Sequence, residues 1–300
     1  MARYLDPKND LAFKRIFGEH DYLCISLLNS LLPLDESERI VSIEYLPAEH
    51  APRTPLGKDS IVDVKCKDAT GRFFIVEMQM FWSFMFMKRI VFNAAQALVK
   101  QADKDAPDER PKMFSDLQPV YTLAIVNQYF PNKDEDRWMY TYKVADIENP
   151  RHVLEGLNFV VIDLETEDLL RKIRAQQGWT MEKKRMAVLW LRFLKETGYS
   201  EQIDRELVED DTIRMAVEIC ETDAFTRDEL DVYDAYLDHI RVELEYADTA
   251  EGYKKLQKAL EDKKKALEEQ GKIIEDKDRA LEDKDRLIEE LKKQLTARSL

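Results

Sequence analysis

The chain has 300 residues, of which 44% are hydrophobic and 35% are charged, so it is long enough for one sizeable domain with an appendage or for two small domains. Its net charge of −14 excludes a general nucleic-acid coat protein, because such proteins are basic, and any contact with nucleic acid must use a local basic patch or metal ions. The three cysteines and four histidines are scattered, which predicts reduced packing thiols and gives no zinc motif.

The N-terminal part of the chain predicts two amphipathic helices. The segment "DPKNDLAFKRIFG" opens with capping residues, spaces its apolar residues as a helix does and is expected to end at Gly18. The segment "DYLCISLLNSLLP" predicts the second helix, which Pro33 ends. The first ten residues are charged, and the longest apolar run, "MQMFWSFMFM", is too short to span a bilayer. We therefore expect a cytoplasmic protein without a signal peptide or membrane contact.

The middle of the chain predicts strands. "RIVSIEYLP" is typical of a strand, and "IVDVKCK" and "RFFIVEMQM" flank the turn sequence "DATG" as in a hairpin. A helical period follows from Trp82 to about Asp103, and "PVYTLAIVN" and "HVLEGLNFVVIDL" each hold a further strand. After about Glu165 the pattern is helical. This order, α-α-β-β-β-α-β-β and then helices, predicts an α+β or mixed α/β body with a helical C-terminal part.

The last segment repeats with a period of seven. One heptad position is apolar throughout: Leu260, Leu267, Ile274, Leu281, Ile288 and Leu295. The second apolar position that a good coiled coil needs is poorly kept. Residues 244–300 hold 15 acids and 14 bases, so the preceding body carries nearly all of the net charge. The segment suits either a solvated single helix or a weak coiled coil that would make a homo-oligomer. We divide the chain into a core of residues 1–165, a helical region of residues 166–246 and a long charged helix of residues 247–300.

The predicted hairpin brings two acids face to face. With the loop at residues 69–71, the register pairs residues whose numbers sum to 140, so Asp63 faces Glu77, and Gln79 lies on the same face. Facing carboxylates repel each other, and a divalent cation such as Mg²⁺, which binds carboxylate oxygens and keeps several waters, would offset the repulsion. The alternative is that these are surface acids on an exposed face of the hairpin.

Four segments together resemble a known family. "PKNDLAFKRIFG", "IVDVKCKD", "FFIVEMQM" and "MKRIVFNAAQAL" are similar to segments of the Rpn family, the recombination-promoting nucleases that are also described as PD-(D/E)xK family transposases. The resemblance covers about residues 5 to 165. It implies a restriction-endonuclease-like PD-(D/E)xK core and an endonuclease that uses Mg²⁺ or Mn²⁺ to cleave DNA in recombination, mobile-element movement or phage defence.

The resemblance also implies roles for individual residues. Asp63 and Glu77 would hold the metal ion, and Gln79 would take the place of the lysine that positions or polarises the attacking water, although an amide carries no charge. Asp10 and Lys65 are accessory candidates, and Asp10 is equally well explained as a cap or first-turn acid of its helix. Four basic residues are candidate DNA contacts and are equally well explained as solvated surface: Lys14, Arg15, Lys88 and Arg89.

A second function is compatible with the sequence. In it, a catalytically degenerate nuclease fold presents its C-terminal helix to partner proteins. The run "FWSFMFM" could stack on unpaired bases in a nuclease or pack in a core or interface in either case. An ordinary metabolic enzyme has little support, because the chain has no glycine-rich phosphate loop and no nucleophile elbow.

Overall fold

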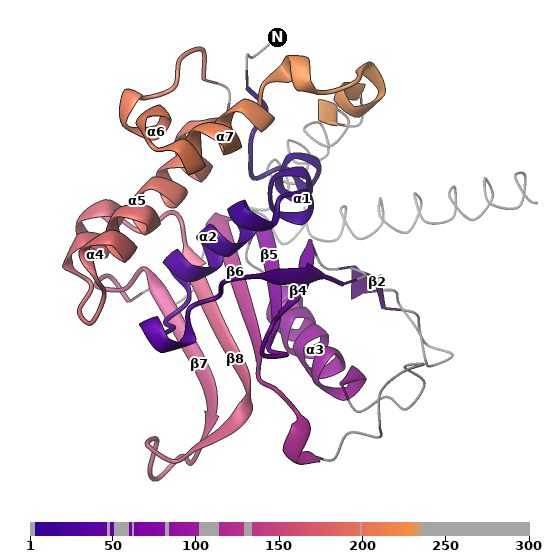
Figure 1. The fold of residues 1–300 in the computed structure, drawn as a ribbon. Helices are drawn as coiled ribbons and strands as arrows, with labels where there is room; N and C mark the ends of the chain where they lie inside the picture. The colour runs from indigo at the N-terminus through magenta and orange to yellow at the C-terminus, as the bar shows by residue number, and fades with distance from the viewer. Residues whose placement is uncertain are drawn as a thin grey trace, which may run out of the picture. The chain divides into compact units, whose positions relative to one another are not determined.

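The computed structural model describes most of the first 234 residues (Figure 1). The described residues are 4–46, 49–50, 60–61, 63–81, 84–101, 114–128, 134–198, 200–231 and 233–234. The chain separates into compact units of residues 1–230 and 231–300. All helices and strands named below belong to the first unit, and the predicted heptad helix lies outside the described residues.

The first unit is built on a six-stranded mixed sheet with the strand order β1-β4-β5-β6-β8-β7. The strands are β1 (Ile43–Tyr45), β4 (Val64–Asp68), β5 (Phe73–Phe81), β6 (Val120–Gln128), β7 (Met139–Ala145) and β8 (Val153–Asp163). Neighbours β1, β4 and β5 are antiparallel, β5, β6 and β8 run parallel, and β7 returns antiparallel beside β8. A separate short pair joins β2 (Glu49–His50) to β3 (Ser60–Ile61).

Helices cover both faces of this sheet. They are α1 (Asp10–Glu19), α2 (Asp21–Leu31), α3 (Phe84–Lys100), α4 (Leu169–Ala175), α5 (Met181–Glu196), α6 (Arg205–Glu209) and α7 (Asp211–Ile219), with short 3₁₀ turns at Glu36–Glu38, Phe114–Asp116 and Thr222–Ala224. One hydrophobic cluster joins α1, α2, α5 and α7 to the sheet face that carries Phe74 and Val76. The other joins α3, through Phe86 and Ile90, to the face that carries Ile75. Strand β5 is therefore buried on both faces, which explains its nearly continuous apolar sequence.

The helical region shares a hydrophobic cluster with the N-terminal helices. Figure 1 shows α2 and α5 side by side, and the two helices are in contact. The ring of Phe17 in α1 lies 5.3 Å from the ring of Trp190 in α5. Among the described residues, no helix combines the length and apolar content needed to cross a bilayer. Cys24, Cys66 and Cys220 are buried free thiols, as predicted.

The hairpin of β4 and β5 has the predicted register. Val64 pairs with Val76 and Cys66 with Phe74, so paired numbers sum to 140. The turn is held by the Asp68 side chain, whose Oδ1 accepts hydrogen bonds from the backbone N–H groups of Thr70 and Arg72 at 3.0 Å. Gly71 has a φ of 89°, a conformation that glycine adopts without strain.

The sequence-based prediction missed strand β7 and the short pair of β2 and β3, and it misplaced one helix end. Strand β7 was not predicted, although Tyr140, Tyr142 and Val144 alternate with the polar residues Thr141 and Lys143 in the period of a strand. Helix α1 continues through Gly18 to Glu19, because the chain turns only at His20, whose backbone is extended. The segment containing Trp82 lies outside the described residues.

Before α1, a buried ion pair fastens the N-terminal segment to α5. Lys8 Nζ lies 2.9 Å from Asp6 Oδ1 and donates a hydrogen bond of 2.9 Å to the carbonyl of Leu194 in α5. The two side chains are only 9% and 10% exposed. Gly198, just after α5, lies so close to Asp6 that a Cβ added at Gly198 would lie 2.9 Å from Asp6 Cγ.

We expect Lys8→Met to lower the free energy of unfolding by about 2–4 kcal/mol, because removal of one partner leaves a buried carboxylate without its cation. Urea unfolding of the purified variant measures the loss. The double variant Asp6→Asn/Lys8→Met is the control and should recover part of it, since no charge then remains at the site. A single variant as stable as the unaltered protein would contradict this account.

Candidate active site

The hairpin holds Asp63 and Glu77 next to each other, as predicted. Glu77 lies in the middle of β5, and Asp63 directly precedes β4, opposite Glu77 in the continued register. Asp63 Oδ2 accepts a hydrogen bond of 2.6 Å from the backbone N–H of Met78. This bond fixes the Asp63 carboxylate across the hairpin, beside the backbone of the residue that follows Glu77.

Helix α3 closes over Glu77. The Glu77 carboxylate accepts a hydrogen bond of 3.0 Å at Oε1 from Asn93 Nδ2 and one of 3.4 Å at Oε2 from Arg89 Nη2. Glu77 is only 1% exposed. The alternative that the acids are surface groups on an open face is therefore wrong, since α3 covers that face of the sheet.

The burial of the two acids makes both harder to ionise. Desolvation and, after it, the charge of Glu77 raise the pKa of Asp63 to about 7, against the effect of the Met78 N–H bond. Burial also raises the pKa of Glu77, while Arg89 and Asn93 oppose that rise. Two neighbouring carboxyl groups with raised pKa values are typical of functional sites, since a bound cation or a reacting group offsets their repulsion there.

Helix α1 contributes a third acid and a cation near this pair. Asp10 further raises the pKa of Asp63, and Lys14 lowers the pKa of both Asp63 and Glu77. Lys14 Nζ lies 2.8 Å from Asp10 Oδ1, one helical turn away. The cap of α1 is Asn9, whose side chain accepts from the Leu11 N–H, so Asp10 is a first-turn acid rather than the cap.

The other predicted basic residues lie in different surroundings. Arg15 stacks 4.4 Å from the ring centre of Phe225 and lies 3.6 Å from Glu229. Lys65 is buried, and its amine lies 5.8 Å from the ring centre of Phe73; burial and the charge of Lys100 lower its pKa to about 8. Neither residue is thus engaged with the acid pair, unlike Lys14.

Residue Gln79 and the helix residue Arg89 are in direct contact. Arg89 Nη2 donates a hydrogen bond of 2.9 Å to Gln79 Oε1 in addition to its contact with Glu77. Lys88, the neighbouring predicted DNA contact, is exposed on α3. The sequence analysis missed Asn93 as a site residue. Its spacing of four from Arg89 places both on one face of a helix and could have identified it.

The two carboxylates fit a divalent metal ion. Among the described residues, no three His, Cys, Asp or Glu side chains converge as metal ligands. Mg²⁺ is commonly bound by one or two carboxylates, with water and phosphate oxygens completing its shell, so Asp63 and Glu77 suffice as protein ligands. Burial disfavours the negative charges of Asp63 and Glu77, and such an ion would neutralise them.

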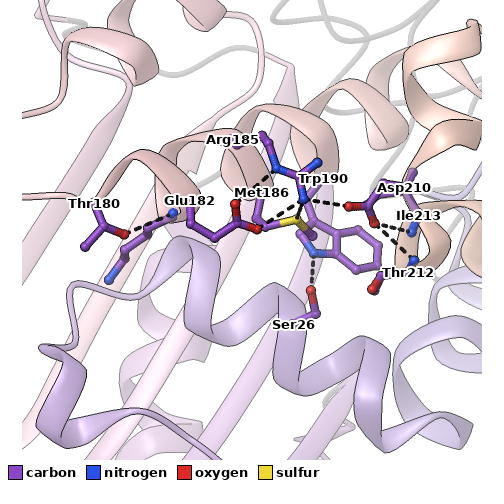
Figure 2. Close-up of polar contacts among 10 residues, drawn as sticks. Ser26, Thr180, Glu182, Arg185, Met186, Trp190, Asp210, Thr212 and Ile213 are labelled. Carbon is purple, nitrogen blue, oxygen red and sulfur yellow. Dashed lines mark hydrogen bonds and ion pairs between the residues drawn. The ribbon is translucent and has the colours of Figure 1, made fainter.

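A hollow of the first unit is lined by other residues than these acids. It has a volume of about 490 Å³ and lies between α2 and the first turns of α5 and α7. Figure 2 shows its polar network: Arg185 contacts Glu182 and Asp210, and Trp190 Nε1 donates to Ser26 Oγ. None of the predicted site residues lines this hollow, and Arg185 in it is paired with Glu182 and Asp210. The acid pair under α3 is therefore the candidate active site.

The chain matches a known family over most of its length. The family model described as "PD-(D/E)XK nuclease family transposase" matches residues 7–250, which include every site residue named above. No curated protein and no solved structure matches the chain.

Proposed function

Because the chain belongs to the PD-(D/E)XK nuclease family transposases, we propose that it is a metal-dependent endonuclease that hydrolyses phosphodiester bonds of DNA. The observation that carries the proposal is the pair of the half-buried Asp63 and the buried Glu77, with Gln79 two residues further along β5. Nuclease chemistry of this family gives a reason for two acids in one buried place, where an ordinary hydrophobic core would exclude them.

The metal ion is Mg²⁺ or Mn²⁺ in this proposal, held by Asp63 and Glu77. When bound, such an ion neutralises charge that develops on the phosphate and lowers the pKa of a coordinated water. The protein itself contributes position and charge. The Met78 N–H fixes Asp63, Asn93 fixes Glu77, and Lys14 adds a positive charge from α1. Hydrolysis adds water across one P–O bond and leaves a phosphate on one DNA end and a hydroxyl on the other.

The proposal includes a local site for DNA rather than a broad basic surface, since the net charge is −14. Arg89 contacts Glu77, and Lys14 lowers the pKa of both acids. Lys88 and Arg15 are their sequence neighbours on α3 and α1 and complete the proposed set of DNA contacts. The family description, which names a transposase, supports a part in mobile-element movement. The proposal also includes DNA recombination or phage defence as the setting and the cytoplasm as the location. Self-association through residues 247–300 belongs to the same proposal.

The test is cleavage of supercoiled plasmid by the purified full-length protein. We expect nicked or linear DNA with Mg²⁺ or Mn²⁺ and none with excess EDTA. The alternative function, a degenerate fold that binds partner proteins, is favoured by the amide at Gln79 in place of the lysine of the wider PD-(D/E)xK signature. No cleavage with either metal ion, by protein that still binds the ion, would support that alternative.

A further inference from the structure

The active site lacks the lysine of the PD-(D/E)xK signature, and Arg89 supplies a positive charge beside the vacated position. Gln79 stands in the place of that lysine, and an amide is neutral. Arg89 Nη2 lies 2.9 Å from Gln79 Oε1 and 3.4 Å from Glu77 Oε2. A guanidinium, which stays protonated at all ordinary pH values, therefore contacts both the metal-binding acid and the side chain that replaces the lysine.

Two features hold Arg89 in this position. It lies one turn before Asn93 on the face of α3 that covers Glu77, and Asn93 itself is fully buried. Its guanidinium carbon lies 5.4 Å from the ring centre of Phe86, which is buried against the sheet. Yet the Arg89 side chain is 45% exposed, so it also reaches solvent, from which a phosphate would approach.

We propose that Arg89 takes over the electrostatic part of the signature lysine's role and that Gln79 positions it. On this proposal, which rests on the proposed function, the guanidinium presents N–H groups to the oxygens of the scissile phosphate, as arginine does in planar, two-point recognition of phosphate. Gln79 acts through Arg89 by accepting its hydrogen bond. Arginine does not exchange protons near neutral pH, so the role is charge stabilisation and not acid–base chemistry.

The decisive comparison is between a variant that removes the positive charge at position 89 and one that also places a positive charge at position 79 in β5. We expect Arg89→Ala to lower the rate of plasmid cleavage by about 100-fold or more, because one donor to a developing charge is worth about that much. The double variant Gln79→Lys/Arg89→Ala restores a cation at position 79 and should cleave at least about tenfold faster than Arg89→Ala. Arg214→Ala is the matched control, since the Arg214 side chain is also 45% exposed and also pairs with carboxylates, but on α7. Its rate should stay within about threefold of the unaltered protein.

A binding measurement separates a charge effect from structural damage. Near pH 8.5, Arg89→Ala should bind Ca²⁺ about twofold or more tighter than the unaltered protein, because a cation that repels the incoming ion is gone. Calorimetric titration with Ca²⁺ measures this without cleavage. Arg89→Ala that cleaves as fast as Arg214→Ala, or a double variant no faster than Arg89→Ala, would overturn the inference.

The two proposals fail in different ways. If the unaltered protein does not cleave DNA with Mg²⁺ or Mn²⁺, the proposed function fails. The Ca²⁺ titration still tests whether the charge of Arg89 acts on the acid pair. An unchanged or weaker Ca²⁺ affinity in Arg89→Ala would then show that Arg89 lends no charge to the acid pair.

Discussion

Replacement of Asp63 by alanine is expected to abolish metal-dependent cleavage of plasmid DNA, with a loss of about 1000-fold or more, because it removes one of the two proposed metal ligands. The variant should remain folded, since Asp63 lies at the end of β4 and outside both hydrophobic clusters. Cleavage rates with Mg²⁺, together with circular dichroism of the variant, test both statements.

Asp210→Ala is the matched control for this loss. The Asp210 side chain is 11% exposed and, like Asp63, accepts backbone N–H bonds, here from Thr212 and Ile213 at the start of α7. Figure 2 shows Asp210 in contact with Arg185, in the hollow that contains no predicted site residue. Its replacement removes a helix cap and should lower the free energy of unfolding by about 1 kcal/mol while cleavage stays within about threefold. Equal cleavage by both variants would exclude the acid pair as the active site.

Replacement of Asp63 by asparagine is expected to stabilise the metal-free protein near pH 8. The pKa of Asp63 rises from 3.8 to about 7 on folding, so the folded state binds this proton more tightly than the unfolded state does. Ionisation of Asp63 therefore lowers the free energy of unfolding as pH rises from about 4 to about 7, and this loss remains in full above pH 7. The shift sets an upper bound of about 4 kcal/mol, and we expect Asp63→Asn to gain about 1–3 kcal/mol in EDTA.

Urea unfolding at two pH values tests the sign of this effect. The gain of Asp63→Asn over the unaltered protein should shrink toward pH 5, where the native carboxyl is already protonated. With Mg²⁺ the order should reverse, since an ion at 1,000 times its dissociation constant stabilises the unaltered protein by about 4.1 kcal/mol and finds only one carboxylate in the variant. As a control, Asp210→Asn should lose stability near pH 8, because it weakens the contact with Arg185. An Asp63→Asn protein less stable than the unaltered one near pH 8 in EDTA would contradict the pKa argument.

The hairpin could be predicted in detail because its determinants are local. Asp68 and Gly71 fix the turn, and the turn fixes the register that brings Asp63 opposite Glu77. The partners that α3 supplies could be predicted only in part. Arg89 was identified as a basic residue near the site, but its contact with Gln79 depends on how α3 docks on the sheet, which the helical period alone does not determine.

Charged residues were harder to place than apolar ones. Arg15 and Lys14 are adjacent in sequence and equally basic, yet the turn of the helix directs Arg15 to Phe225, a residue more than 200 positions away, and Lys14 toward the acids. Lys65 lies on the predicted face of β4, but its buried amine lies over the Phe73 ring, and burial and the charge of Lys100 lower its pKa. The positions of these side chains depend on tertiary contacts, so they could not be predicted from the sequence alone.

The short stretch of chain that builds the site has a consequence for folding. Asp63, Glu77, Gln79, Arg89 and Asn93 all fall between β4 and the middle of α3. Hairpins of this kind close in about 1–10 μs, and a short loop has little closure entropy to overcome. Parallel pairing of β5 with β6 must wait for the long crossover that contains α3. We therefore expect the two carboxylates to meet while water still surrounds them, and their repulsion to reach its full strength only when β6 docks late in folding.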